Sequence, residues 1–109
     1  MRAEAQALKG HLDTLLLASL EAGPRHGYAV RESLRAASGA QFDLPTGTIY
    51  PALRRLEAAG LVRGTWSDAA GRRRRLYDLT PAGRRKLTGD RAAWRDFASA
   101  VTAILEPGS

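Results

Sequence analysis

The sequence predicts a mainly α-helical fold with one small β-hairpin and a long carboxyl-terminal helix. Three observations predict this class. Leucines recur at helical spacing near the amino end, two short extended runs follow a third helical stretch, and a last apolar pattern covers about 25 residues. A chain of 109 residues suits one domain with a modest core.

The first two helices are predicted from apolar spacing and from the residues that end them. Residues 4–22 are expected to form the first helix, which Gly23-Pro24 ends. Its apolar stripe consists of Leu8, Leu12, Leu15, Leu16 and Leu20. A second short helix is expected over Gly27–Ala37, and Ser38-Gly39 ends it.

A third helix is predicted within the segment Leu44–Gly60, with Gly60 as its carboxyl-terminal stop. Either Thr46 or Thr48 could cap its start. A cap at Thr48 places Pro51 in the first turn, where the backbone N–H needs no acceptor. A cap at Thr46 makes that turn irregular, because Pro51 then removes a hydrogen bond.

The remaining elements are a hairpin and a final helix. Two extended runs, Leu61–Ser67 and Arg74–Leu79, flank the loop Asp68-Ala69-Ala70-Gly71. Thr80-Pro81 is a typical helix start, so the last helix is expected from Pro81 to Leu105. Three compact helices followed by a hairpin are the parts of a winged helix-turn-helix. We therefore expect a winged helix-turn-helix domain over residues 1–80 and a dimerisation helix over 81–105.

Composition limits the classes of function. The net charge is +6, from 17 Lys and Arg against 11 Asp and Glu, which favours a polyanionic partner. A GC-rich genome would also enrich arginine. The absence of cysteine excludes disulfides, thiolate chemistry and Cys-based zinc sites. No apolar stretch is long enough to span a membrane and the amino end lacks a signal-peptide core, so a cytoplasmic protein is expected.

No catalytic arrangement is found in the sequence. His11 and His26 are the only histidines, and neither has a partner at metal-ligand or catalytic spacing. The glycines form no phosphate-binding motif. We therefore expect no enzymatic activity, no cofactor and no metal.

The third predicted helix is the candidate DNA-reading element. Its core-facing stripe is Ile49, Leu53 and Leu56. In helix-turn-helix proteins, the amino-terminal part of the second motif helix meets base edges and directs free N–H groups at phosphates. The candidate contacts are Thr46, Gly47, Thr48 and Tyr50, with Arg54 and Arg55 as phosphate anchors. The alternative is a simple amphipathic helix with solvated arginines.

Four consecutive arginines follow Gly71 at the tip or descending strand of the hairpin: Arg72, Arg73, Arg74 and Arg75. A basic tip beside a recognition helix suits a wing that binds phosphates or an adjacent minor groove. A solvated turn is the alternative. Four neighbouring arginines repel one another unless an anion is present, which favours the wing.

The final helix carries an a/d seam that Asp90 interrupts. A helix of about 25 residues is about 37 Å long, more than a small domain can cover, which favours dimerisation over self-packing. The first helix is expected to contribute. The candidate dimer-interface residues are Leu8, Leu12, Leu87, Trp94, Phe97, Val101 and Ile104. Trp66 is expected in the core or in strand packing.

Four stretches of the chain resemble the PadR family of transcription regulators. They are LLLASLEAGPRHGYAV at 15–30, LPTGTIYPALRRLEAAGLV at 44–62, GRRRRLY at 71–77 and LTPAGR at 79–84. Together they span most of the chain in the expected order, and the run GTIYPALRRL is the most specific element. The chain ends one helix after the wing, so it is similar to the short-tailed members.

The resemblance implies a winged helix-turn-helix, a carboxyl-terminal dimerisation helix and repression at a roughly palindromic operator. It favours as DNA contacts the residues Thr46, Gly47, Thr48, Tyr50, Pro51 and Arg54. In some short relatives, a tryptophan of the last helix lines an apolar space between subunits and stacks on planar ligands. Trp94 matches it, and is the candidate residue for a small planar hydrophobic effector. An ordinary interface tryptophan is the alternative.

The predicted function is that of a sequence-specific transcriptional repressor. The expected partners are a palindromic operator in double-stranded DNA and a second copy of the chain. The alternative is a winged-helix module for protein–protein or RNA interaction, without operator preference.

Overall fold

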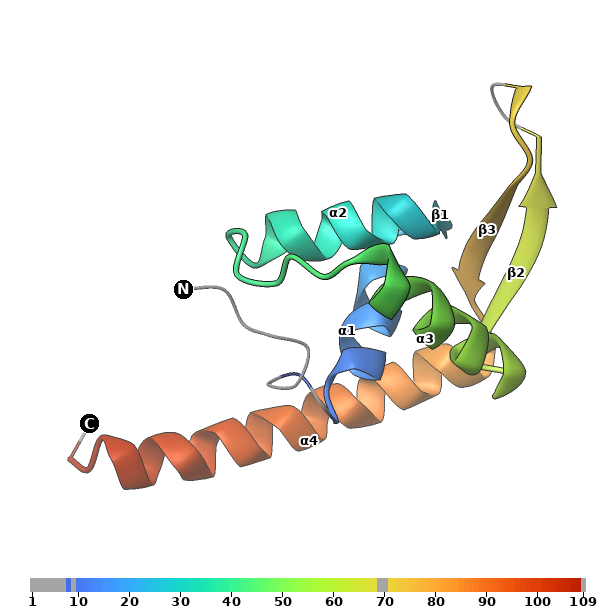
Figure 1. Cartoon of the computed structure of the whole chain (residues 1–109). Coiled ribbons are helices and arrows are strands. Elements are labelled where there is room, and N and C mark those ends of the chain that lie inside the picture. The colour runs from blue at the N-terminus through green and yellow to red at the C-terminus, as the bar shows by residue number, and fades with distance from the viewer. Residues whose placement is uncertain (1–7, 9, 69–70, 109) are drawn as a thin grey trace.

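The computed structural model describes residues 8, 10–68 and 71–108. The helices are α1 (Leu12–Ser19), α2 (Gly27–Ala37), α3 (Thr46–Ala58) and α4 (Pro81–Leu105). The strands are β1 (Arg25–His26), β2 (Val62–Ser67) and β3 (Arg74–Leu79). Figure 1 shows α1, α2 and α3 packed together, with the β2–β3 hairpin projecting on one side and α4 running past α1 and beyond. The predicted class, mainly α with a winged helix-turn-helix and a long last helix, is confirmed.

The first helix is shorter than the predicted span 4–22. It begins at Leu12, after Gly10, whose φ of +88° is a left-handed conformation that interrupts a right-handed helix. It ends at Ser19, and turn hydrogen bonds follow it. Residues 4–7 and 9 of the predicted span lie outside the described residues. The second and fourth helices have the predicted bounds.

The sheet has three strands rather than the two of the predicted hairpin. All pairs are antiparallel in the order β1-β3-β2, and Arg25 lies opposite Tyr77. The two-residue strand β1 is too short to show an alternating pattern, so the sequence did not indicate it. His26 ends β1, precedes α2 and lies 3.1 Å through Nδ1 from the carbonyl oxygen of Arg75. This short strand therefore joins α2 to the base of the wing.

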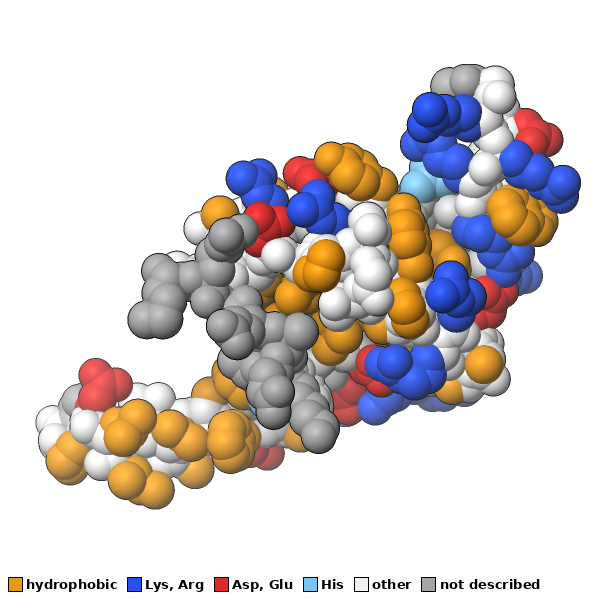
Figure 2. Space-filling model, viewed as in Figure 1, with side chains coloured by type: hydrophobic (Ala, Val, Ile, Leu, Met, Phe, Trp, Pro, Cys, Tyr) orange, Lys and Arg blue, Asp and Glu red, His pale blue; other side chains and the backbone are white. Residues whose placement is uncertain are grey.

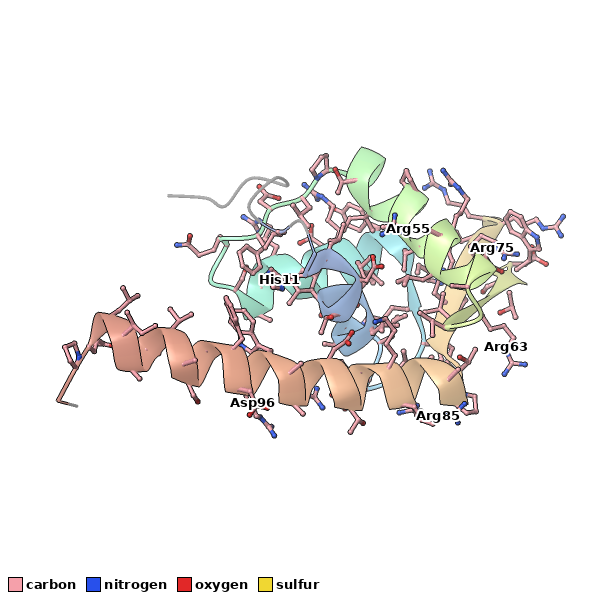
Figure 3. The ribbon with its side chains drawn as sticks, turned by 90° about the horizontal axis from the view of Figure 1, so that it is seen from below. His11, Arg55, Arg63, Arg75, Arg85 and Asp96 are labelled. Atoms are coloured by element: carbon pink, nitrogen blue, oxygen red, sulfur yellow. The ribbon has the colours of Figure 1, made fainter. Side chains whose placement is uncertain are left out.

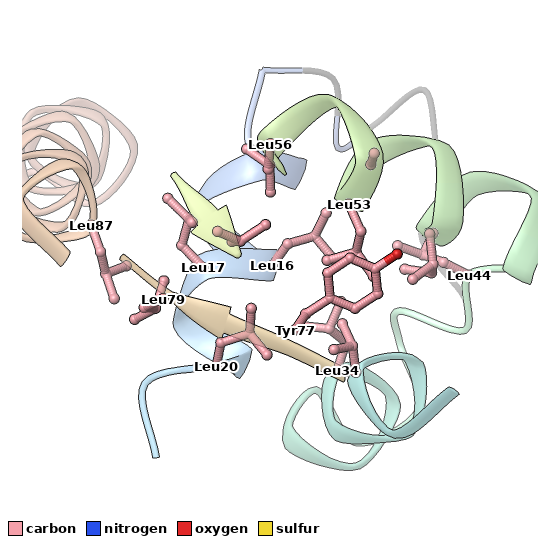
Figure 4. Packing of buried hydrophobic residues seen from close by; sticks show 14 of the residues in the cluster. Leu16, Leu17, Leu20, Leu34, Leu44, Leu53, Leu56, Tyr77, Leu79 and Leu87 are labelled. Carbon is pink, nitrogen blue, oxygen red and sulfur yellow. The ribbon is translucent and has the colours of Figure 1, made fainter. Parts of the chain in front are cut away.

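The core lies between the three compact helices and the base of the hairpin. Figure 4 shows leucines of α1 against Leu53 and Leu56 of α3, with Tyr77 and Leu79 of β3 beside them. The predicted stripe on α3 is buried, as expected. Leu87 adds the first part of α4 to the same core.

The start of α4 is fixed by a cap and a close backbone contact. The hydroxyl of Thr80 accepts a hydrogen bond from Gly83 N at 3.0 Å and donates one to Gly60 O at 2.7 Å. A Cβ on Gly83 would lie 2.0 Å from the carbonyl oxygen of Leu61. Only glycine therefore lets α4 approach the turn between α3 and β2 this closely.

Polar contacts hold the first half of α4 on α1. Thr14 donates to Asp90 at 2.9 Å, and Arg91 contacts both carboxylate oxygens of Glu21 at 2.8 and 3.1 Å. Asp90, which interrupts the predicted seam, thus accepts a hydrogen bond that links α4 to α1. Beyond it α4 leaves the domain, and the molecule measures 57 × 31 × 21 Å along its principal axes.

In the part of the chain that the structure describes, every helix is too short or too polar to cross a bilayer.

Candidate nucleic-acid interface

The start of α3 differs from both predicted caps. The helix begins at Thr46 with Pro45 as its N-cap, and the Pro45 carbonyl accepts from Thr48 N at 2.9 Å and Ile49 N at 3.2 Å. Neither threonine side chain caps the helix. Pro51 therefore lies inside the helix rather than in its first turn, and the carbonyl of residue 47 lacks its usual α-helical donor.

This first turn is exposed and held from behind. Thr46 and Gly47 are exposed, and the N–H groups of these first two helical residues have no acceptor within the helix. Arg31 of α2 donates through Nε to the carbonyl of Leu44 at 2.7 Å and pairs with Asp43 at 3.1 Å. The connection before α3 is thus fixed to α2, which orients the amino end of the helix.

Tyr50 lies against the start of α2. A Cβ added to Gly27 would be only 2.0 Å from Cε1 of Tyr50, so the ring occupies the space above the glycine. The side chain is nevertheless 36% exposed. One part of the ring packs on α2 while another part stays accessible to a partner.

A groove joins the two elements that the sequence singled out. It has a volume of about 650 Å³ and is lined by Tyr28, Tyr50, Arg72, Arg73 and Arg74. Three of these side chains are cationic and two are aromatic. Figure 2 shows basic side chains gathered over the wing, beside the amino-terminal end of α2. The structure therefore brings the predicted tyrosine and three of the four predicted wing arginines to one surface.

Tyr28 is the residue of this groove that sequence reasoning missed. It is an exposed aromatic side chain at the start of α2, and the Arg31 guanidinium lies 5.8 Å from its ring centre. The tyrosine stands in the stretch 15–30 that resembles the family, but no role was predicted for it. The sequence alone could not show that Tyr28 is exposed and faces the wing, because this depends on where the hairpin packs relative to α2.

Arg75 differs from the other three arginines of the run. Its guanidinium contacts the carboxylate of Glu57, packs over Gly64 and lies 5.1 Å from the ring centre of Trp66. The hydrogen bond to Glu57 raises the pKa of Arg75 above its usual range. Arg75 is half-buried and lies outside the groove of Tyr50. It braces the wing against α3, whereas we had expected it among the DNA contacts.

Trp66 is exposed on the wing, so its predicted place in the core is wrong and strand packing is confirmed. It lies opposite Arg75 in the β2–β3 register. The guanidinium carbon of Arg73 is 4.7 Å from its ring centre. The tryptophan thus supports two arginines through cation–π contacts.

The two arginines of α3 also differ. Arg55 pairs with Asp13 of α1 and lines the opposite side of the molecule, toward α4 (Figure 3). Arg54 is exposed and makes no ion pair with any residue that the structure describes. Of the predicted anchors on α3, Arg54 alone keeps a free guanidinium.

The predicted dimer seam divides into two parts. Leu8 and Leu87 are 6% and 2% exposed, so they belong to the core of their own domain rather than to an interface. Leu12 is half-buried against that core. The rest of the seam is exposed or half-buried beyond the domain: Trp94, Phe97, Val101 and Ile104. Figure 2 shows hydrophobic side chains gathered on the far half of α4.

Comparisons with known proteins agree with this architecture. A family model described as the transcriptional regulator PadR-like family matches residues 16–89, well over half of the chain. The chain belongs to this family. The match covers the groove and the first part of α4. Because the family consists of transcriptional regulators, the prediction that the chain is not an enzyme is confirmed at family level.

Three similar proteins, one curated regulator and two solved structures, agree with this family. It is 43% identical over 77 residues to the transcriptional regulator Rv3488 of Mycobacterium tuberculosis, covering 71% of this chain and 59% of that protein. The chain thus spans less than two thirds of that relative. A PadR family regulator from Eggerthella lenta has a TM-score of 0.80 at 32% identity, covering 94% of this chain and 88% of that one. A PadR family transcription regulator from Clostridium difficile has a TM-score of 0.77 at 30% identity, and the match covers 88% of this chain and 99% of that one.

Proposed function

We propose that this PadR-like chain binds double-stranded DNA as a homodimer and represses transcription from a roughly palindromic operator. The groove between α3 and the wing carries the proposal. Its lining combines three arginines with two tyrosines and, among the described residues, includes no acidic side chain. A cationic groove beside an exposed helix start matches a phosphate backbone and the base edges next to it.

The roles within this surface follow from what each side chain already contacts. Thr46, Gly47, Thr48 and Tyr50 are the parts of α3 offered to base edges, because they form its exposed first turns. Pro51 is exposed beside them and offers an apolar surface. Arg54, Arg72 and Arg74 make no ion pair with any described residue, which leaves their guanidinium groups for phosphates, whereas the Arg73 guanidinium lies over the ring of Trp66.

The second copy is assigned to the exposed half of α4. Trp94, Phe97 and Ile104 are 51%, 58% and 77% exposed, and Trp94 meets His11 edge-on at 5.3 Å between ring centres. Burial of such a face against a second α4 is favourable by about 25 cal/mol per Å² of apolar surface. A two-fold dimer would present two copies of α3 to half-sites about one DNA turn apart.

The experiment is a binding-site selection from random duplexes, followed by affinity measurements over a salt series. We expect one palindrome to emerge and to bind far more tightly than random DNA. The double variant Arg72→Ala/Arg74→Ala should weaken binding to both duplexes. The control is Arg85→Ala, because Arg85 is exposed on the side of α4 that faces away from the other helices (Figure 3).

Two results would overturn the proposal. Equal affinity for the selected and random duplexes would show that the chain does not recognise an operator. That result would favour the alternative function, a winged-helix module for protein–protein or RNA interaction. A loss of binding in the Arg85→Ala control as large as in the double variant would show that the groove is not the binding surface.

A second proposal concerns an effector. An open groove between α1 and α4 includes His11, Phe97 and Trp94, whose indole is 51% exposed. A planar hydrophobic compound could stack on this indole at the dimer seam. Quenching of Trp94 fluorescence by acridine, measured in a Trp66→Phe background, supports the proposal. Quenching that stays unchanged in Trp94→Ala chains with Trp66 present would oppose it.

A further inference from the structure

We propose that Gly27, at the start of α2, is a positioning residue that sets the pose of the Tyr50 ring and thereby the sequence preference of the interface. The inference rests on the proposed function, because it assigns the origin of specificity within the same groove. Gly27 is itself buried; it directly precedes Tyr28 of the groove lining in the chain, and Tyr50 is the side chain nearest to the space above its Cα.

The argument begins with the space above the glycine. An ideal Cβ on Gly27 would lie 2.0 Å from Cε1, 2.6 Å from Cδ1 and 3.1 Å from Cζ of Tyr50. Carbon atoms in contact are normally about 3.5–4.0 Å apart. One edge of the ring therefore occupies the volume that any other residue at position 27 would fill.

The backbone of Gly27 does not itself require glycine. Gly27 is the first residue of α2, and it is not among the described glycines with positive φ. Alanine is a better helix former than glycine at such a position. The steric conflict is thus the reason for glycine here, and it concerns a single side chain.

The conflict can be relieved without unfolding the domain. The three atoms nearest the added Cβ belong to the Tyr50 ring, which is partly exposed and can rotate about its side-chain bonds. Gly83 is different, because the nearest atom there is a backbone oxygen that cannot move away. We therefore expect Gly27→Ala to displace Tyr50 and to leave the core intact.

The displaced ring would change recognition selectively. Tyr50 forms one wall of the groove, while the free guanidinium groups of Arg72 and Arg74 belong to the wing. Phosphate contacts carry binding to any sequence, whereas base-edge contacts carry preference. Gly27→Ala should therefore lower affinity for the preferred duplex and leave affinity for random DNA nearly unchanged. A tenfold loss of preference, about the effect of one mismatched base pair, is expected.

The test is a double-mutant cycle measured by fluorescence anisotropy. The probes are the duplex selected by the wild-type chain and one random duplex of equal length. Gly27→Ala and Tyr50→Ala should each reduce the ratio of the two affinities. The double variant should match Tyr50→Ala alone, because Gly27 acts only through the ring. Gly89→Ala is the control, since its added Cβ would meet nothing within 4 Å in α4.

A second measurement needs no DNA. The Tyr50 ring beside Gly27 should displace the Hα resonances of that glycine from their usual position in the proton NMR spectrum, and Tyr50→Ala should abolish the displacement. An unshifted Gly27 in the wild type would overturn the inference.

The binding results separate this inference from the proposed function. A wild-type chain without preference among duplexes overturns the proposed function. A wild-type preference that survives Gly27→Ala, or additive losses in the double variant, overturns the role of Gly27 alone.

Discussion

The carboxylate of Glu57, at the end of α3, contacts the guanidinium of Arg75 on β3 and also accepts a hydrogen bond from Gly64 N at 3.2 Å. One side chain thus joins α3 to both strands of the wing. The wing can hold its angle to α3 before any DNA is present. The guanidinium of Arg75 is engaged with Glu57, although Arg75 follows the groove arginines Arg72, Arg73 and Arg74 directly in the sequence.

The first prediction separates the brace from the phosphate contacts. Arg74→Ala should reduce the slope of log K against log salt by about 0.9, the value for one lost phosphate contact on B-DNA. Arg75→Ala should lower the melting temperature and leave that slope unchanged, because Arg75 is engaged with Glu57 and Trp66. A salt titration and a thermal melt of both variants check this. The reverse pattern would mean that Arg75 is a phosphate contact.

The second prediction concerns the docking of α4. Gly83→Ala should destabilise the domain by about 1–3 kcal/mol, the usual cost of overpacking, because the new Cβ would meet the backbone oxygen of Leu61. Gly89→Ala is the matched change in the same helix, where the space is open. It should stabilise by about 0.5–1 kcal/mol through helix propensity. Urea unfolding measures both, and equal effects would contradict the close contact.

The third prediction concerns the exposed half of α4. Ile104 is 77% exposed, and Ile104→Glu should convert the dimer to a monomer by placing a charge in an apolar interface. Ser99→Glu adds the same charge on the opposite side of the helix, about 140° away at 100° per residue, and should remain dimeric. Sedimentation velocity distinguishes the two. A dimeric Ile104→Glu chain would place the interface elsewhere.

The fourth prediction concerns pH. The hydrogen bonds from Arg91 lower the pKa of Glu21 below its ordinary value of 4.5. A lowered folded-state pKa means that the pair contributes stability above pH 4.5 and loses it as the pH falls through the lowered value. The difference in melting temperature between wild type and Glu21→Gln should therefore be constant near neutrality and shrink in acid. Both side chains are well exposed, so it should be small. A difference that grows below pH 4.5 would contradict the pairing.

Much of the fold could be predicted because its signals are local. Thr80-Pro81 marks the start of α4, and the structure begins the helix there with Thr80 as its cap. The stripe of Ile49, Leu53 and Leu56 identified the buried face of α3. In each case, the residues that determine the feature lie within a few positions of it.

The errors came from relationships across the chain. Apolar spacing alone does not distinguish a helix face buried in its own domain from a face that packs against a second copy. Leu8 and Leu87 were therefore predicted in the dimer interface, whereas the structure buries them in the core of the domain. The arginine run looked uniform, but the partner of Arg75 lies 18 residues earlier. The contact of Gly27 with Tyr50 also joins two helices, and no local pattern predicts it.

The central claim is that the groove between α3 and the wing recognises a DNA sequence. The most direct measurement is the ratio of dissociation constants for a random duplex and for the palindrome selected by the wild-type chain, at physiological salt. The account predicts a ratio of about 1000 or more, as for specific DNA-binding proteins. A ratio near one would contradict it.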